Sequence, residues 1–465
     1  MIFNKNLGNI IVSSTPGLIS IFLSFFTIPI YLKYLGLEKY GNFLILHILL
    51  SIVMITNFNL GKIASIKMQK VITKTKNSII STTIFTSIIS SALVCLFLYF
   101  IFLILINFNH NLVFSNYKIL FLALFFSNIY VTLENISKGL KFYFLSSFGN
   151  LIFYSLSLSL PALFILFDFK SYESVNSLFS ISVYIKISGI LLISITLIYK
   201  KLLTFSFSSL IIKDFLAYAK WQTLSSTYVQ IFDFFDKYLI KLFLGAANLS
   251  LYSIPQQIAG KLSVISDGLI SVFIPKISSS KNKKKTFEIL NSNFYGFFYL
   301  IGFFLILINP FIDQILIWWL KADANLSIIY LFKIFLIISF YICITHLIST
   351  FLDTQNLSKK NSQIETFVLI FFIIGLFISV YYKNINFFAY TMLIRSLVAF
   401  FIKAFYIKKY LLNFNILILQ NIIFLLIFLF SVNGSFELFY FLSSLFLLLL
   451  FIYFPKEIVK KEFLK

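Results

Sequence analysis

The sequence predicts an all-α membrane protein that crosses the bilayer many times. Hydrophobic residues make up 60% of the 465 residues and charged residues only 12%, the reverse of what a soluble or disordered chain needs. Uncharged apolar stretches follow one another along the whole chain, and each is as long as the roughly 20 residues that a span requires. Lys and Arg gather beside the ends of these stretches. We therefore expect about 14 transmembrane helices.

The first six spans are expected between residues 10 and 199. A spanning β-strand would alternate apolar and polar residues, whereas the stretch 93–106 is apolar on every side. A short turn containing Leu35-Gly36 joins the first two spans. The predicted limits are 10–32, 41–61, 79–106, 117–133, 143–167 and 176–199.

Six more spans follow a basic segment, and two others close the chain. Their predicted limits are 218–244, 250–275, 293–312, 326–352, 366–382, 386–405, 415–433 and 437–454. This order predicts four parts, which are an N-terminal six-helix bundle at 1–200, a cytoplasmic linker at 201–217, a C-terminal six-helix bundle at 218–409, and two additional helices with a basic cytoplasmic tail at 410–465.

A weak internal sequence repeat favours duplication of the six-helix bundle. Tyr31 to Gly36, followed by Tyr40, leaves one span and enters the next, as Tyr238 to Gly245, followed by Tyr252, does in the second half. Leu-Gly turns between helices are common, but these two fall at matching places. An even number of spans per half would relate the halves by an axis along the membrane normal.

The distribution of Lys and Arg predicts the orientation. With the amino terminus in the cytoplasm, 26 of them lie on the cytoplasmic side and 7 on the outer side. Positive charge is retained on the cytoplasmic side of membrane proteins, so both termini are expected there. The net charge of +22 is thereby explained without nucleic acid. The seven outer lysines are Lys33, Lys39, Lys118, Lys170, Lys241, Lys321 and Lys383.

Enzymatic chemistry has little room in this chain. The longest polar connections, 200–217 and 276–292, are too short to form a domain. The three histidines are scattered, and no Ser/His/Asp order, carboxylate pair or phosphate-binding glycine loop is visible. The two cysteines lie inside apolar stretches and have no metal-ligand spacing. We expect no enzyme activity, no cofactor, no metal and no built-in ATPase.

Four short motifs resemble one transporter family. They are Pro29-Ile-Tyr31-Leu-Lys-Tyr-Leu35-Gly36-Leu-Glu38-Lys-Tyr40-Gly41, Asn59-Leu-Gly61-Lys-Ile-Ala64, Asp236-Lys237-Tyr-Leu-Ile240 and Phe273-Ile-Pro275. These residues resemble the polysaccharide-transporter branch of the multidrug/oligosaccharidyl-lipid/polysaccharide (MOP) exporter superfamily, which includes the O-antigen flippases. One departure is that Asn57 and Asn59 stand where relatives often carry an acid.

The resemblance implies a function, a location and partners. It implies a flippase in the bacterial cytoplasmic (inner) membrane that moves an undecaprenyl-diphosphate-linked oligosaccharide, such as an O-antigen or other surface polysaccharide repeat unit, to the outer leaflet by alternating access. The implied partners are this lipid-linked oligosaccharide, membrane lipids, a coupling proton or sodium ion, and a polysaccharide polymerase. It leaves open which glycan is carried.

Charged residues inside the spans are the candidate site. A charge at mid-bilayer costs about 2.5–3.5 kcal/mol on the insertion scale, so such residues normally face a wet cavity or a partner. Positive charge outweighs negative in the predicted interior, which suits an anionic diphosphate. We expect Lys186, Lys261, Arg395 and, with a lower rank, Lys333 to line a cationic cavity. The eight interior charges are Lys186, Asp233, Asp236, Lys237, Lys261, Asp267, Lys333 and Arg395.

A second group is a candidate for coupling or gating. Asp233 and Lys237 share one face of the seventh span with Gln230, and Asp236 lies beside them. An Asp233–Lys237 pair that only fixes helix packing is the alternative. Pro16, in the first span, is the preferred hinge because proline frees a backbone carbonyl and permits a kink.

Two other functions compete with the flippase. A multidrug exporter of the same fold would be expected to carry acids in its cavity for cationic drugs, and the positive bias argues against it. A membrane-embedded glycosyltransferase or acyltransferase would need a reactive acid or histidine at a mouth of the bundle, and none stands out.

Overall fold

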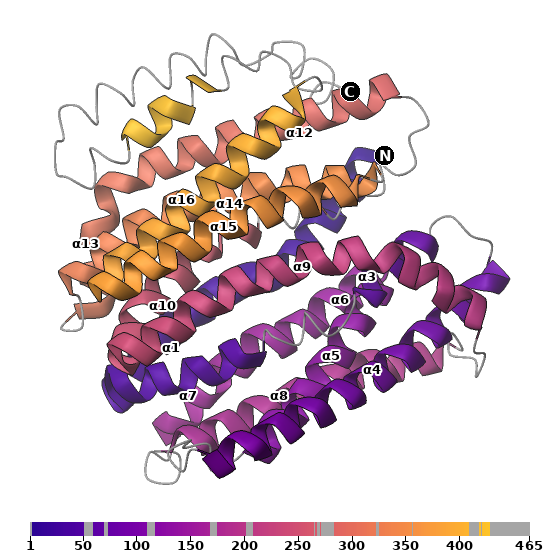
Figure 1. Cartoon of the computed structure of the whole chain (residues 1–465), viewed down its shortest axis with the longest axis horizontal. Coiled ribbons are helices and arrows are strands. Elements are labelled where there is room, and N and C mark those ends of the chain that lie inside the picture. Colours follow the sequence, from indigo (N-terminus) through magenta and orange to yellow (C-terminus); the bar gives the residue numbers. More distant parts are fainter. Residues whose placement is uncertain are drawn as a thin grey trace. The chain divides into compact units, whose positions relative to one another are not determined.

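The computed structural model describes a helical chain in two compact units, residues 1–250 and 251–465 (Figure 1). The described residues are 2–50, 59–68, 73–108, 117–167, 174–200, 208–264, 266, 270, 283–321, 325–355, 357–408, 418–419 and 421–427. Within these ranges no residue is in a β-strand, which confirms the prediction of an all-α membrane fold. The division into bundles at 1–200 and 218–409 stays a prediction.

The first unit consists of long helices with close contacts between them. A Cβ atom added to Gly139 in α5 would lie 2.7 Å from the Cα atom of Ser65 in α3, so small residues let these two helices approach. Tyr130, Phe153 and Ile193 belong to its buried core. The elements of the unit are α1 (Ile2–Leu49), α3 (Leu60–Met68), α4 (Thr73–Phe108), α5 (Tyr117–Gly139), α6 (Tyr143–Asn150), η2 (Leu151–Leu156), α7 (Ser157–Phe167), α8 (Val175–Tyr199), α9 (Ser209–Leu244) and the first turn of α10 (Ala246–Gly260).

Two glycine turns occupy equivalent places in this unit. Gly36 interrupts α1 with φ 73° and ψ 171°, and Gly245 ends α9 with φ 91° and ψ 169°. The segments that follow them touch, because Ser250 Oγ donates a hydrogen bond to the Leu37 carbonyl over 2.6 Å. A Cβ atom added to Gly41 would lie 2.0 Å from the carbonyl oxygen of Ala246. The repeated sequence thus adopts a repeated conformation.

The second unit is arranged around α14. This helix is buried over most of its length, and Phe335, Phe340 and Tyr341 lie among its fully buried side chains. A Cβ atom added to Gly375 in α15 would lie 2.5 Å from Cγ2 of Thr391 in α16. The described elements that lie wholly in this unit are α12 (Lys283–Ile308), η3 (Asn309–Phe311), α13 (Ile312–Leu320), α14 (Leu326–Thr354), α15 (Ser358–Tyr382) and α16 (Ile385–Tyr406).

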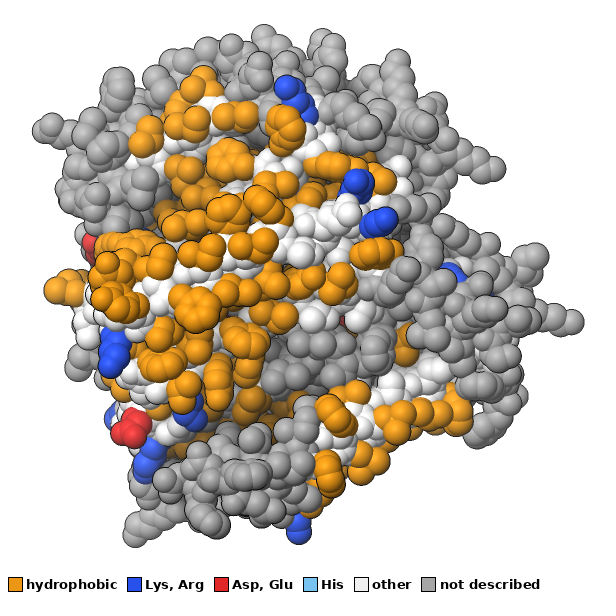
Figure 2. All heavy atoms as spheres, viewed as in Figure 1, with side chains coloured by type: hydrophobic (Ala, Val, Ile, Leu, Met, Phe, Trp, Pro, Cys, Tyr) orange, Lys and Arg blue, Asp and Glu red, His pale blue; other side chains and the backbone are white. Residues whose placement is uncertain are grey.

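The surface of the described helices is apolar. Phe22, Phe167 and Phe377 are strongly exposed, and hydrophobic side chains predominate over charges in the coloured part of the face in Figure 2. Among the described residues, nine helical stretches have the length and apolarity needed to cross a membrane. Exposed apolar helices of this kind are stable in lipid. The protein is therefore a multi-pass membrane protein.

Several predicted spans agree closely with these helices. The span predicted at 143–167 is the continuous run α6, η2 and α7. The span at 218–244 is helical in α9, although α9 is not among the nine stretches. The helix of the span at 250–275 ends early, because α10 stops at Gly260. Most of the two C-terminal spans, 415–433 and 437–454, lies outside the described residues, so the number 14 stays a prediction.

Candidate functional site

Lys186 is a buried cation in the middle of α8. Its Nζ atom donates a hydrogen bond to the Phe153 carbonyl over 3.1 Å and lies 4.1 Å from the centre of the Phe153 ring and 5.7 Å from that of Tyr154. Only 6% of the residue is exposed. Within the part of the chain that the structure describes, no acidic side chain forms an ion pair with it. A carbonyl dipole and two aromatic faces compensate its charge instead.

The Phe153 carbonyl is available because η2 is a π-helix. The Ser157 N–H donates to the Ile152 carbonyl, five residues earlier, where an α-helix would use the Phe153 carbonyl. Ser157 Oγ donates to the Phe153 carbonyl over 2.5 Å, as Lys186 Nζ does. Single π-turns of this kind occur often at functional sites.

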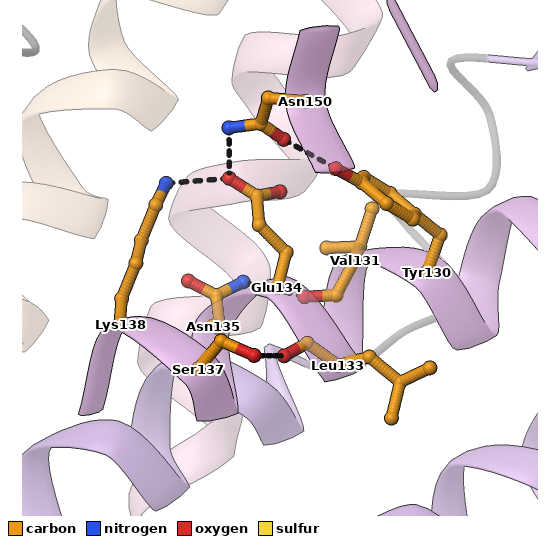
Figure 3. Close-up of polar contacts among 8 residues, drawn as sticks. All are labelled: Tyr130, Val131, Leu133, Glu134, Asn135, Ser137, Lys138 and Asn150. Carbon is orange, nitrogen blue, oxygen red and sulfur yellow. Dashed lines mark hydrogen bonds and ion pairs between the residues drawn. The ribbon is translucent and has the colours of Figure 1, made fainter. Parts of the chain in front are cut away.

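A polar network connects the last residue of α6, directly before η2, with the end of α5 that is predicted to be cytoplasmic (Figure 3). The Tyr130 hydroxyl donates to Asn150 Oδ1 over 2.6 Å, and Asn150 Nδ2 donates to Glu134 Oε1 over 2.9 Å. Glu134 also forms an ion pair with Lys138 over 2.5 Å. The Glu134 side chain is 9% exposed and that of Lys138 45%, so the network runs from the protein interior to a surface.

Pro16 lies beside the same segment. It is buried in α1, and its carbonyl accepts a hydrogen bond from Ser155 Oγ of η2 over 3.4 Å. The helix continues through Pro16, and the non-helical residue of α1 is Gly36. The predicted hinge role of Pro16 stays a prediction.

The charged group on α9 is held together by short-range contacts. The Lys237 N–H donates to Asp236 Oδ1 over 2.7 Å, and Lys237 Nζ lies 3.9 Å from the same oxygen. Lys237 Nζ also donates to the backbone carbonyl of Asp233 over 2.5 Å. The ion-pair partner of Lys237 is thus Asp236, which is fully buried, and the contact with Asp233 is to its backbone. The coupling role of Asp233, Asp236 and Lys237 stays a prediction.

The remaining candidate cations lie on separate elements of the second unit. Arg395 is buried in α16, and Lys261 is partly exposed in a turn just after α10. The helix α10 ends at Gly260, one residue before Lys261. Lys333 forms an ion pair with Asp313 over 2.8 Å. Asp267 lies outside the described residues.

Among the described residues, sequence reasoning missed four charged residues that the structure buries, which are Glu134, Asp353, Glu365 and Lys403. Glu134 and Lys138 have the i, i+4 spacing of a helical ion pair, which was a usable signal. Lys403 in α16 donates to Glu365 in α15 and, over 2.7 Å, to Ser349 Oγ in α14. Both members of this pair are buried. No local spacing connects Glu365 and Lys403, so only the fold brings them together.

Several solved structures of transporters have a fold similar to that of this chain. An outward-facing MATE family multidrug resistance transporter of the MOP superfamily has a TM-score of 0.65 at 15% identity, with 86% of this chain and 96% of that chain covered. The Vibrio cholerae MATE transporter VcmN in its bent form has a TM-score of 0.63 at 14% identity, with 88% of this chain and 97% of that chain covered. The lipid II flippase MurJ in an inward closed conformation has a TM-score of 0.64 at 17% identity, with 94% of this chain and 98% of that chain covered.

These similarities show that the chain has the fold of the MOP superfamily transporters. A family model described as polysaccharide biosynthesis protein matches residues 7–281. The chain belongs to this family, and the family resemblance predicted from its short motifs is confirmed. A comparison with curated protein sequences finds no match.

Proposed function

We propose that the protein is a flippase for an undecaprenyl-diphosphate-linked oligosaccharide, an O-antigen or other surface polysaccharide repeat unit. It would move this lipid from the cytoplasmic to the outer leaflet of the bacterial inner membrane. Membership of the polysaccharide biosynthesis family supports the class of substrate. The fold, which the lipid II flippase MurJ shares, supports a transport function over an enzymatic one.

The observation that carries this proposal is the environment of Lys186. A buried lysine in a membrane helix is costly unless something compensates its charge. The compensation described for Lys186 consists of one carbonyl and two rings, and all of these are weaker partners than a phosphate oxygen. A diphosphate would therefore find a cation that is not already neutralised by an acid among the described residues.

The proposed mechanism is alternating access. The diphosphate and glycan enter from the cytoplasm and bind Lys186, Lys261 and Arg395, with Lys333 as a further candidate, while the polyprenyl tail stays in lipid. A proton or sodium ion acts through Asp233, Asp236 and Lys237, with Pro16 as the hinge. A polysaccharide polymerase would receive the released unit on the outer side.

The rival functions make a different demand on the site. A multidrug exporter of the same fold, as the MATE transporters are, would need an acidic cavity for cationic drugs. A glycosyltransferase or acyltransferase would need a reactive side chain at a mouth. The buried cations Lys186 and Arg395 fit neither demand.

The test is export of surface glycan in complemented cells, normalised to the amount of protein in the membrane. Lys261→Ala and Arg395→Ala should each reduce export strongly at normal protein levels. Arg395→Lys should retain part of the activity, because the charge remains while the two-pronged guanidinium is lost. Lys360→Ala, at an exposed position of α15, is the matched control. Full export in both alanine variants would contradict the cationic-cavity proposal.

A further inference from the structure

The π-turn in the first unit depends on a donor from another helix. Because the Ser157 N–H donates to the Ile152 carbonyl, the Phe153 carbonyl lacks the amide that it would have in an α-helix. Lys186 Nζ and Ser157 Oγ take its place, over 3.1 and 2.5 Å. Without Lys186 this buried carbonyl would keep only the neutral Ser157 hydroxyl as a donor. The side chain of Lys186 therefore stabilises this register of the helix.

Glycines allow α8 to approach closely enough for this contact. A Cβ atom on Gly149 would lie 2.7 Å from Cδ1 of Ile193, and one on Gly189 would lie 3.3 Å from Cγ2 of Ile152. Both contacts are made by residues just before Phe153 in the chain, and a Cβ atom on Gly189 would lie 3.6 Å from the Gly149 carbonyl oxygen.

The Phe153 ring is fixed on both of its faces. Tyr130 stacks on it with ring centres 3.8 Å apart and planes 2° from parallel. A stack this close leaves no room for an ammonium, so Lys186, 4.1 Å from the same ring centre, occupies the opposite face. Tyr130 is hydrogen-bonded to Asn150, and Asn150 to Glu134, which forms the ion pair with Lys138. A change of register at 150–157 would therefore disturb the ion pair at the end of α5 (Figure 3).

We propose that Lys186 is a latch on this π-turn and that an anionic diphosphate opens it. The inference rests on the proposed function, which supplies the diphosphate. A phosphate oxygen carries negative charge whereas the Phe153 carbonyl offers only a dipole, so the ammonium binds the phosphate more strongly and the ligand draws Lys186 away from the carbonyl. The Phe153 carbonyl then keeps only Ser157 Oγ as a side-chain donor, and the helical turn at 150–157 loosens.

This relaxation links substrate binding to two distant features. Asn150 turns with the segment and releases Tyr130 and Glu134, which frees Lys138 at the end of α5. Ser155 turns with it as well and releases the carbonyl of Pro16 in α1. Binding at the middle of α8 would thus loosen both the predicted cytoplasmic mouth and the predicted hinge.

The first experiment tests the latch without a ligand. Amide hydrogen exchange of segment 150–158 is measured in the purified full-length protein in nanodiscs. Lys186→Met should speed this exchange about tenfold, the factor that corresponds to about 1.4 kcal/mol. Lys186→Gln, which keeps a shorter neutral donor, is the second variant in case Lys186→Met does not fold. Ser188→Ala, at an exposed position of the same helix, should leave the exchange unchanged. Wild-type exchange in the folded Lys186 variants would overturn the latch.

The second experiment adds geranylgeranyl diphosphate, with geranylgeraniol as the uncharged control, and measures binding in the same samples. The diphosphate should speed exchange at 150–158 in the wild type and have no further effect in Lys186→Met. Binding without any change in exchange overturns the latch and leaves the proposed function standing. Absence of binding contradicts the proposed function and the opening of the latch together. An equal response to geranylgeraniol would assign the effect to the tail and overturn the role of the anion.

Discussion

Two glycines adopt a backbone conformation that other residues reach only with strain. Gly36 and Gly245 have nearly the same φ and ψ, 73° and 171° against 91° and 169°. Among the described residues, no heavy atom beyond the adjoining residues lies within 4 Å of the position that a Cβ would occupy at Gly36 or Gly245. Any cost of substitution therefore comes from the backbone conformation, which lies in a region almost restricted to glycine. The shared conformation supports an origin of the two hairpins by duplication.

Gly36→Ala and Gly245→Ala should each destabilise the protein by about 1–3 kcal/mol. The measurement is thermal unfolding in detergent. Gly296→Ala is the matched control, because Gly296 lies inside α12 without a positive φ and also has open space around its Cβ position. This control should be neutral or stabilising by about 0.5–1 kcal/mol. Equal effects at all three positions would contradict the conformational argument.

Individual charged residues show where sequence reasoning succeeds and where it fails. Lys186 was predicted because an uncompensated charge inside an apolar stretch is visible in the sequence. Its partner, the Phe153 carbonyl, was not, since a π-turn has no local sequence signature. Glu134 and Glu365 escaped because the predicted spans stop at 133 and begin at 366. A span drawn from apolarity ends at the first charge, whereas α5 and α15 continue past it.

At the scale of helices, α14, α15 and α16 are joined by one buried polar contact. Lys403 of α16 donates to Glu365 of α15 and Ser349 of α14. The charge count placed Lys403 among the cytoplasmic lysines, but only 2% of it is exposed. Unlike Lys186, Lys403 is neutralised by an acid, which gives it a structural role in the second unit.

Lys403→Ala should lower the amount of folded protein in the membrane, because it leaves Glu365 buried without its cation. Breaking such a pair costs about 3–5 kcal/mol, whereas replacing both members by apolar residues is often neutral. The double change Lys403→Met with Glu365→Leu should therefore recover much of the loss. Abundance and thermal unfolding are compared with Lys360→Ala, an exposed position on α15. A double variant as unstable as Lys403→Ala would contradict the pairing argument.

Helices themselves were predicted more reliably than their interruptions. The span at 143–167 matches α6, η2 and α7 because twenty or more apolar residues leave no alternative to a helix in lipid. The end of α10 at Gly260 was not anticipated, since glycine inside an apolar stretch is tolerated in many membrane helices. Interruptions depend on contacts between helices, and the sequence of one helix does not contain them.

For the molecule as a whole, the distribution of charge determines the expected orientation. Lys and Arg number 26 on one predicted side and 7 on the other. Moving the basic connections across the bilayer would oppose the bias that sets topology. The non-helical residues Gly36 and Gly245 fall in the two short connections between these predicted spans. The predicted topology places both turns outside the cell.

Labelling of single cysteines tests this orientation directly. In a background without Cys95 and Cys343, a cysteine at Asn248 should react in intact cells with a membrane-impermeant maleimide, since Asn248 follows the Gly245 turn and is partly exposed. A cysteine at Asn282, which lies outside the described residues, should react only after the cells are permeabilised, because the surrounding lysines hold that connection in the cytoplasm. The permeabilised sample also shows that the cysteine is accessible. Labelling of Asn282 from outside would reverse the topology, and with it the direction in which the proposed substrate enters.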